Sequence, residues 1–356
     1  MNITFFIGNG FDLNLGLKTK YSDFYPFFIQ NSSENNMIRN WLNGNEKLWS
    51  DLEEKLGQEL EKLGKDDLEQ FYIDKEELDR LLIDYLEKEQ EKYTFEEKEK
   101  IKSEFKRSML EFAKELPSKN VDSINATLTA YRAEEYSYSF VTFNYTNILD
   151  KIMDLFKDNR VVGTHQGNGT AKYNRLGEIV HIHGTTDEEM ILGVNDASQI
   201  LNNELKIDAL FLNTFIKPRM NEAIGQKKIE KAKQMINSSH IICIFGMSLG
   251  NTDKMWWEEI IKWLVASDNN KLIIFWKGHN EELRKKLPAT IIRLNEHIRR
   301  NLFEKGKGGR YGEKEYNRIK EKIMILYNSK IFSLPKAEEF VSFDLTSIFG
   351  DMPIIE

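Results

Sequence analysis

Polar residues with catalytic capacity follow four apolar runs of the sequence. The segments are "GNGFD" (8–12), "NYT" (144–146), "HIHG" (181–184) and "GMSLG" (246–250), with Asp253 close behind the last. Imidazole, carboxylate and amide groups transfer protons and orient water in enzymes. The apolar runs themselves carry almost no polar residues, and packing alone does not explain this sorting of residue types. It therefore predicts one polar site where several strands end.

The first segment is typical of a backbone loop that approaches a phosphate. Gly8 and Gly10 have no Cβ atom to block the approach, and the N–H groups of residues 8–11 lie at the start of an expected helix. Leu13 stands where the dinucleotide fingerprint G-x-G-x-x-G has its last glycine, so the match is imperfect. Asp12 suits a ribose hydroxyl or a developing positive charge. The alternatives are a plain tight turn and a helix N-cap at Asp12.

The fourth segment also fits the G-x-S-x-G pattern of a nucleophile elbow around Ser248. Asp268, His279 and His297 follow, but they do not form a pair of strand-end residues. The sequence therefore disfavours a lipase-type triad.

The elements that must position these residues form an alternating pattern. Apolar runs of strand length alternate with helical patterns, which indicates a doubly wound, mostly parallel α/β sheet covered on both faces. In such sheets ligands bind beyond the carboxyl ends of the strands. The predicted strand segments are residues 2–7, 136–146, 178–184, 190–196, 239–250 and 271–278.

A helical block interrupts this pattern after the first strand. Residues 47–116 are rich in Glu and Lys with leucines at helical spacing, and Ser50 with Glu53 fits a capping box. We expect a large helical insertion at residues 31–135. The α/β domain then consists of residues 1–30 and 136–356.

Composition excludes several classes of protein. The 356 residues are 40% hydrophobic and 12% aromatic, which argues against global disorder. A net charge of −7 gives no sign of general nucleic-acid binding. Cys243 is the single cysteine, which excludes an internal disulfide and a Cys-rich zinc site and fits a reducing cytoplasm. No apolar run approaches about 18 residues, so we expect no membrane span.

Taken in order, the four segments resemble the motifs of sirtuin-like proteins. The glycine loop with Gly16 and Asp23-Phe24 resembles their phosphate loop. "TFNYT" (142–146) and "HIHG" resemble the segments that carry their catalytic asparagine and histidine. "GMSLGNTD" (246–253) resembles their nucleotide-contacting loop. The combination is most similar to the AbiH family of phage abortive-infection proteins.

The resemblance implies a sirtuin-like fold and an anti-phage effector that hydrolyses NAD to nicotinamide and ADP-ribose. The implied catalytic residues are Asn144, His183 and Asp12. The implied NAD-binding residues are Gly8, Asn9, Gly10, Phe11, Asp12, Thr142, Asn144, His183, Gly246, Ser248, Leu249 and Asp253. No metal is expected. Asp12, Tyr25 and Thr146 depart from the deacetylase pattern and the zinc cysteines are missing, so protein deacetylation is not implied.

Two other functions stay open at this point. In the first, the pocket binds a nucleotide as a sensor and breaks no bond. In the second, Asp12, Asp196 and Asp253 hold Mg²⁺ in a nuclease or nucleotide hydrolase. A phage trigger, a partner protein and a second copy of the chain are the candidate partners of the helical block.

Overall fold

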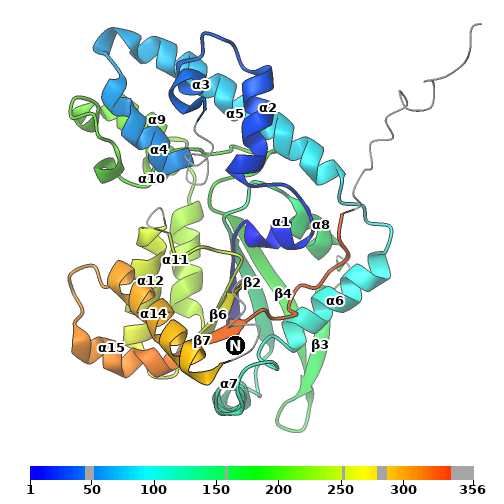
Figure 1. Cartoon of the computed structure of the whole chain (residues 1–356). Coiled ribbons are helices and arrows are strands. Elements are labelled where there is room, and N and C mark those ends of the chain that lie inside the picture. Colours follow the sequence, from blue (N-terminus) through cyan, green and yellow to red (C-terminus); the bar gives the residue numbers. More distant parts are fainter. Residues whose placement is uncertain (45–51, 157–158, 251–252, 279–286, 338–356) are drawn as a thin grey trace, which may run out of the picture.

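A seven-stranded sheet forms the centre of the molecule in this computed structural model (Figure 1). The structure describes residues 1–44, 52–156, 159–250, 253–278 and 287–337. The strands are β1 (Asn2–Ile7), β2 (Tyr136–Thr142), β3 (Val161–Gln166), β4 (Ala171–His181), β5 (Ile241–Phe245), β6 (Lys271–Trp276) and β7 (Ile323–Tyr327).

The sheet order, β3-β4-β2-β1-β5-β6-β7, confirms the predicted mostly parallel α/β class. All neighbouring strands pair in parallel except β3 with β4, which form an antiparallel hairpin at one edge. The chain passes from β1 to β2 and β4 on one side and returns to β5 on the other side. The point where the order reverses therefore lies between β1 and β5, and ligands of open α/β sheets bind at such a point.

Helices cover both faces of the sheet and its carboxyl end (Figure 1). The helices before β2 are α1 (Gly10–Asn14), α2 (Tyr21–Asn31), α3 (Met37–Leu42), α4 (Leu52–Glu59), α5 (Leu68–Glu91), α6 (Lys98–Leu110) and α7 (Ser118–Ala130). The later ones are α8 (Ile148–Asp154), α9 (Ala209–Phe215), α10 (Lys217–Ala223), α11 (Lys228–Ser238), α12 (Lys254–Ala266), α14 (Pro288–Gly306) and α15 (Glu313–Ile319).

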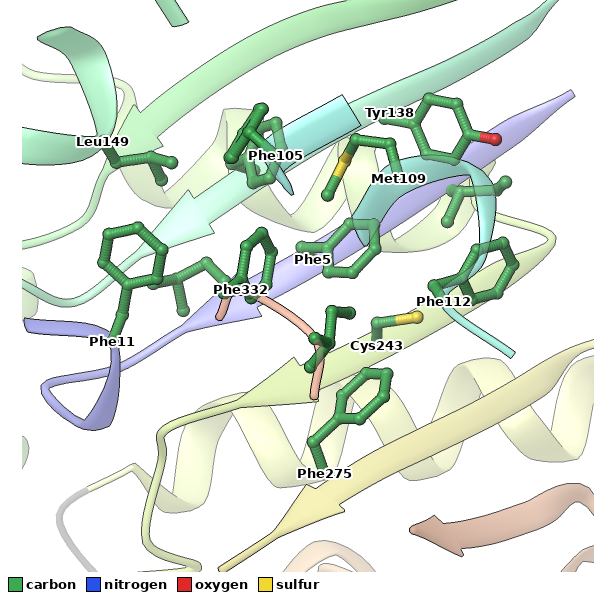
Figure 2. Close-up of a cluster of buried hydrophobic side chains, with 14 of the residues drawn as sticks. Phe5, Phe11, Phe105, Met109, Phe112, Tyr138, Leu149, Cys243, Phe275 and Phe332 are labelled. Carbon is green, nitrogen blue, oxygen red and sulfur yellow. The ribbon is translucent and has the colours of Figure 1, made fainter. Parts of the chain in front are cut away.

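One face of the sheet packs against α6, α7, α8 and the segment that follows β7. Figure 2 shows Phe5 of β1 among aromatic side chains: Phe105 of α6, Phe112 of the turn after α6, and Phe332 of the segment after β7. The Phe5 ring stacks on Phe140 at a centroid distance of 5.6 Å. Such apolar burial on both faces explains why β1 is a continuous apolar run rather than an alternating one.

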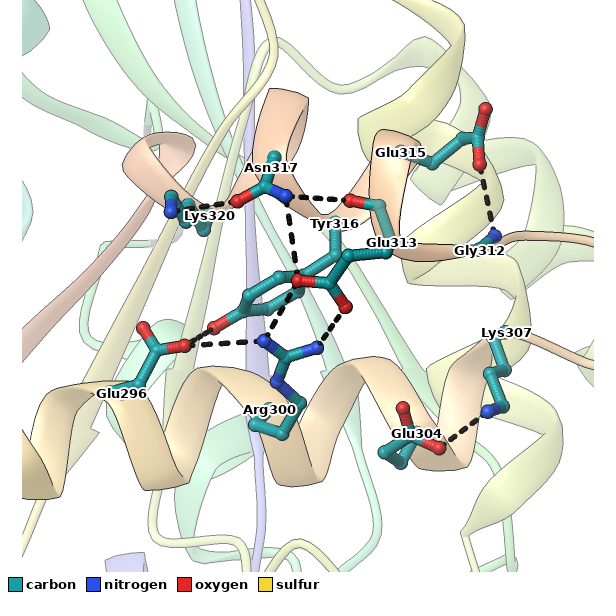
Figure 3. Close-up of polar contacts among 10 residues, drawn as sticks. All are labelled: Glu296, Arg300, Glu304, Lys307, Gly312, Glu313, Glu315, Tyr316, Asn317 and Lys320. Atoms are coloured by element: carbon teal, nitrogen blue, oxygen red, sulfur yellow. Dashed lines mark hydrogen bonds and ion pairs between the residues drawn. The ribbon is translucent and has the colours of Figure 1, made fainter.

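The opposite face packs against α11, α12, α14 and α15. Trp256 and Trp257 of α12 are buried there and pack the helix against the sheet. Figure 3 shows how α14 and α15 are joined at the surface: Arg300 pairs with Glu313, and the Tyr316 hydroxyl donates to Glu296 at 2.6 Å.

The predicted helical block is divided between two cores. Helices α6 and α7 contribute to the core against β1, whereas α2 to α5 share a separate core with residues 190–216. We call α2 to α5 together with α9 and α10 the helical unit; Figure 1 shows it gathered at one end of the sheet. The domain boundaries that we gave, and the sirtuin-like detail of the fold, stay predictions.

Several predicted elements differ from those observed. The segment 190–196 forms no strand; only Val194 makes a single bridge, to Ile216, because this segment serves the core of the helical unit. The strand predicted for 239–250 ends at Phe245, and the helical stretch after residue 201 is broken into α9, α10 and α11. β3 and β7 were not predicted. Within the described residues, no helix is both long and apolar enough to cross a membrane.

Candidate functional site

A pocket of about 970 Å³ lies at the carboxyl ends of the strands. The loops after β1, β2, β4 and β5 form one side of it, and α2, α4 and α5 of the helical unit form the other. This volume is at the upper end of the range found for small-molecule sites. The predicted site residues that line it are Gly8, Asn9, Gly10, Asp12, Asn144, His183, Gly246, Ser248 and Asp253.

Three predicted nucleotide-binding residues lie behind the pocket wall. Phe11 is fully buried in the core, with its ring edge-on to Phe332 at 5.4 Å. Leu249 belongs to the core on the opposite face. The Thr142 hydroxyl accepts a hydrogen bond from the backbone N–H of Asn144 at 3.2 Å. These residues hold the loops that line the pocket.

The glycines of the first and fourth segments pack against each other. The N–H of Gly8 donates to the Phe245 carbonyl at 3.0 Å and that of Gly10 to the Gly246 carbonyl at 2.8 Å. A Cβ atom on Gly10 would lie 2.4 Å from the Cα of Gly246, which itself has a φ of +70°. The glycines therefore allow two loops at the reversal point of the sheet to touch.

This packing corrects part of the predicted phosphate loop. Among residues 8–11, the N–H groups of Gly8, Gly10 and Phe11 all donate to backbone carbonyls. They are therefore not available to a phosphate, contrary to our expectation. The sequence showed the glycines, but not that the loop after β5 uses their N–H groups.

Asp12 is buried at the wall of the pocket next to residues that follow β2. The Thr146 hydroxyl donates to Asp12 Oδ2 at 2.7 Å. Burial raises the pKa of the Asp12 carboxyl from its ordinary value of 3.8 to about 6, while hydrogen bonding by Thr146 and Asn144 acts in the opposite direction. Asp12 Oδ1 and Asn144 Oδ1 are buried without a hydrogen-bond partner in the described structure. Such atoms are suited to polar groups of a ligand.

His183 lies two residues beyond the end of β4, between two aromatic rings. The ring of Phe143 meets it edge-on at 5.6 Å, and that of Tyr145 is tilted at 6.0 Å. Burial lowers the pKa of His183 well below its ordinary value, and the Lys217 ammonium lowers it further. At neutral pH the imidazole is therefore uncharged. Gly184, with a φ of +72°, turns the chain directly after it.

The other histidine of this segment has a different partner. Nε2 of His181 lies 2.8 Å from Asp150 Oδ2 on α8, whereas His181 is not among the residues that line the pocket. The structure thus separates the two histidines, and His183 is the one at the site.

A polar cluster at the pocket was missed by the sequence analysis. Glu53 of α4 forms an ion pair with Lys217 of α10 at 2.6 Å and accepts hydrogen bonds from the hydroxyls of Tyr21 and Tyr145. We interpreted Glu53 only as the capping partner of Ser50, which lies outside the described residues. No local signal connects Glu53 with Lys217, which is 164 positions away.

Cationic and aromatic side chains contribute to the rest of the lining. Lys20, directly before α2, and Lys277, directly after β6, are exposed, and Trp276 at the end of β6 is partly buried. Exposed ammonium groups can bind phosphate as point charges. These two ammonium groups are therefore candidate partners for an anionic ligand in the pocket.

The carboxylates considered for Mg²⁺ are not brought together. Asp12 and Asp253 line the pocket, but Asp196 caps the short helix η4 (Ala197–Gln199), where its Oδ1 accepts from the Ser198 N–H at 2.7 Å. Among the residues with described positions, no group of three or more His, Cys, Asp or Glu side chains is arranged to hold a metal ion.

Comparison with known proteins identifies one family. The family described as "Bacteriophage abortive infection AbiH" matches residues 4–276, which is more than half of the chain and contains every residue of the pocket discussed so far except Lys277. A comparison with curated proteins finds no match.

Proposed function

The chain belongs to the AbiH family of bacteriophage abortive-infection proteins, and from that premise we propose that it acts in phage defence by hydrolysing NAD. In the proposed reaction water attacks the anomeric carbon of the nicotinamide ribose and the N-glycosidic bond breaks. The products are nicotinamide, ADP-ribose and one proton.

One observation carries this proposal. Asp12, Asn144 and His183 follow three different strands, and all three line one pocket although each is at most 6% exposed. Buried polar groups cost free energy unless they have partners. Their convergence beside the reversal point of a parallel sheet supports a binding site for a polar ligand.

Each of the three groups has a role suited to glycosidic cleavage. The transition state of this reaction has oxocarbenium character, and the ionised Asp12 carboxylate stabilises that positive charge. Asn144 orients the attacking water through its unpartnered amide oxygen. His183 is neutral and accepts the proton that this water releases.

The charge of NAD is consistent with the lining of the pocket. Its two phosphates lie toward Lys20 and Lys277 in this proposal, because the N–H groups of Gly8, Gly10 and Phe11 are used within the protein. The aromatic surface of Trp276 is available to the adenine ring.

The test is an assay of nicotinamide release from NAD by the purified protein, with and without an extract of phage-infected cells. We expect Asn144→Ala and His183→Ala to lower the rate by about 10²–10⁴, the usual contribution of a positioned acid or base. His297→Ala on α14, outside the pocket lining, is the control. Equal rates for all three variants and the wild type would refute the proposal.

A second candidate function is favoured by the environment of His183. Because its pKa lies well below the ordinary value, the imidazole is a weak base, and this suits a pocket that binds a nucleotide as a signal. Calorimetry separates the two functions. Tight binding of NAD or ADP-ribose without product, also in the infected-cell extract, supports the sensor.

A further inference from the structure

We propose that Glu53 of α4 is a positioning residue for His183, acting through Lys217 and Tyr145, so that the site is complete only when the helical unit is docked on the sheet. The inference rests on the proposed function only for the catalytic role of His183. The contacts on which it stands are independent of that role.

Glu53 is the centre of a buried network. One carboxylate oxygen lies 2.6 Å from Lys217 Nζ, and the other lies 3.2 Å from both the Tyr21 and the Tyr145 hydroxyls. The side chains of Glu53 and Lys217 are only 10% and 3% exposed. All four residues line the pocket. Both carboxylate oxygens therefore have donors, and these come from α2, α10 and the loop after β2.

Tyr145 connects this network to His183 through two contacts. Its ring lies 6.0 Å from the His183 ring, and its single hydroxyl proton is shared between Glu53 Oε1 at 3.2 Å and the Ile191 carbonyl at 3.1 Å. The Ile191 N–H in turn donates to the His183 carbonyl at 2.8 Å. Moving the Tyr145 hydroxyl would therefore disturb both the ring and the backbone of His183.

Helix α10 provides a second connection. The Lys217 N–H donates to the Val194 carbonyl at 2.8 Å, and Asn221 Nδ2 lies 3.3 Å from both the Lys217 and the Ile182 carbonyls. Ile182 directly precedes His183. The Lys217 ammonium also lowers the pKa of His183, so the two side chains interact electrostatically.

Glu53 is the residue through which this network depends on the position of α4. Without its carboxylate, the buried Lys217 ammonium loses its counter-ion, and the arrangement of α10 and Tyr145 loses its common acceptor. A buried ion pair often has a purely structural role, and the experiment has to separate that role from positioning.

The experiment follows the His183 ring by NMR in protein labelled at histidine, with the signal assigned by its loss in His183→Ala. The variants are Glu53→Gln, Lys217→Met, Lys217→Arg and the double variant Glu53→Gln/Lys217→Met. Lys75→Met is the control, because the buried Lys75 ammonium pairs with the half-buried Asp79 carboxylate at 2.6 Å within α5 and Lys75 does not line the pocket.

We expect Glu53→Gln and Lys217→Met to move the His183 ring signals, and Lys217→Met to raise the pKa of His183 toward its ordinary value. Lys217→Arg keeps the ion pair and the wild-type signals. Lys75→Met lowers the unfolding temperature and leaves the His183 signals unchanged.

If Glu53→Gln does not fold, the double variant decides, because it has no unpaired buried charge. Displaced His183 signals in that variant support the inference. Variants that unfold earlier but keep wild-type His183 signals and titration overturn it, since Glu53 would then be only a stabilising residue. No substrate is present, so a failure of NAD hydrolysis would refute the proposed function and leave this result in place.

Discussion

Asp12→Asn should make the protein more stable at neutral pH while removing a group of the candidate site. Asp12 is buried, and its pKa is raised from 3.8 to about 6. At about 1.36 kcal/mol for each pH unit, this difference of about 2.2 makes the ionised carboxylate cost about 3 kcal/mol of folding free energy above pH 7. An asparagine has no charge to bury, and its Oδ1 can still accept the hydrogen bond from Thr146.

The sign of the pH dependence follows from the direction of this shift. The folded protein binds the Asp12 proton more tightly than the unfolded chain does, so stability falls as pH rises from about 3.8 to about 6 and then becomes level. The same relation gives a cost of about 1.6 kcal/mol at pH 5 and about 3 kcal/mol at pH 8. The advantage of the variant should therefore grow by about 1.4 kcal/mol between these two pH values.

Urea unfolding of the wild type and Asp12→Asn at several pH values measures this difference, and all other titrating groups cancel in it. Asp122→Asn on the exposed surface of α7 is the control for the loss of a carboxylate that is not buried. A stability difference that is independent of pH, or a variant that is less stable at pH 8, would show that the ionised Asp12 carboxylate does not cost the folding free energy that we infer. Residues of functional sites often lower the stability of the folded protein in this way.

Three further outcomes test the packing and the charges around the pocket. Gly10→Ala should destabilise the protein by about 1–3 kcal/mol, since its Cβ would overlap the Gly246 backbone. Gly312→Ala, with its nearest neighbour at 3.8 Å, has no such overlap and should cost less. Burial raises the pKa of Cys243 well above its ordinary value, so a thiol reagent should label it only in denaturant; rapid labelling of the native protein contradicts the fold. Lys277→Ala should weaken binding of ADP-ribose and reduce its dependence on salt in calorimetry, and unchanged binding would place the phosphates elsewhere.

The sequence predicted correctly those features that depend on a single strand and the residues directly after it. β1 was predicted because a parallel strand buried on both faces is a short continuous apolar run, and the polar residues after it mark where it ends. Asn144 and His183 could be assigned to one pocket because parallel strands place their carboxyl ends together. β3 could not be found this way: it is an edge strand with alternating exposed residues, and antiparallel pairing with β4 stabilises it.

The rest of the site depends on contacts between segments that are distant in the chain. The sequence around Gly8 and Gly10 is the same whether their N–H groups bind a phosphate or the chain at the end of β5. Only the position of β5 beside β1 shows that they bind the chain. Glu53 resembles any of the surface glutamates in its helical block. Its burial depends on Lys217, which could be recognised only after the helical unit is placed on the sheet.

The pKa of Asp12 is raised and that of His183 is lowered. These directions identify which group causes the loss of activity at low pH, the acid limb, in a pH–rate profile of the proposed hydrolysis. A limb near pH 6 would ordinarily be attributed to a histidine. Here His183 is already neutral well below that pH, so loss of activity should follow protonation of Asp12, with an apparent pKa of about 6. Hydrogen bonding by Thr146 lowers the pKa of Asp12, so Thr146→Val should move the limb to higher pH, while Thr146→Ser should leave it in place. The profile of kcat/KM for NAD against pH provides the measurement. A limb that stays unchanged in Thr146→Val would have to belong to another group, and Asp12 would then lose its role as the charge that meets the oxocarbenium ion.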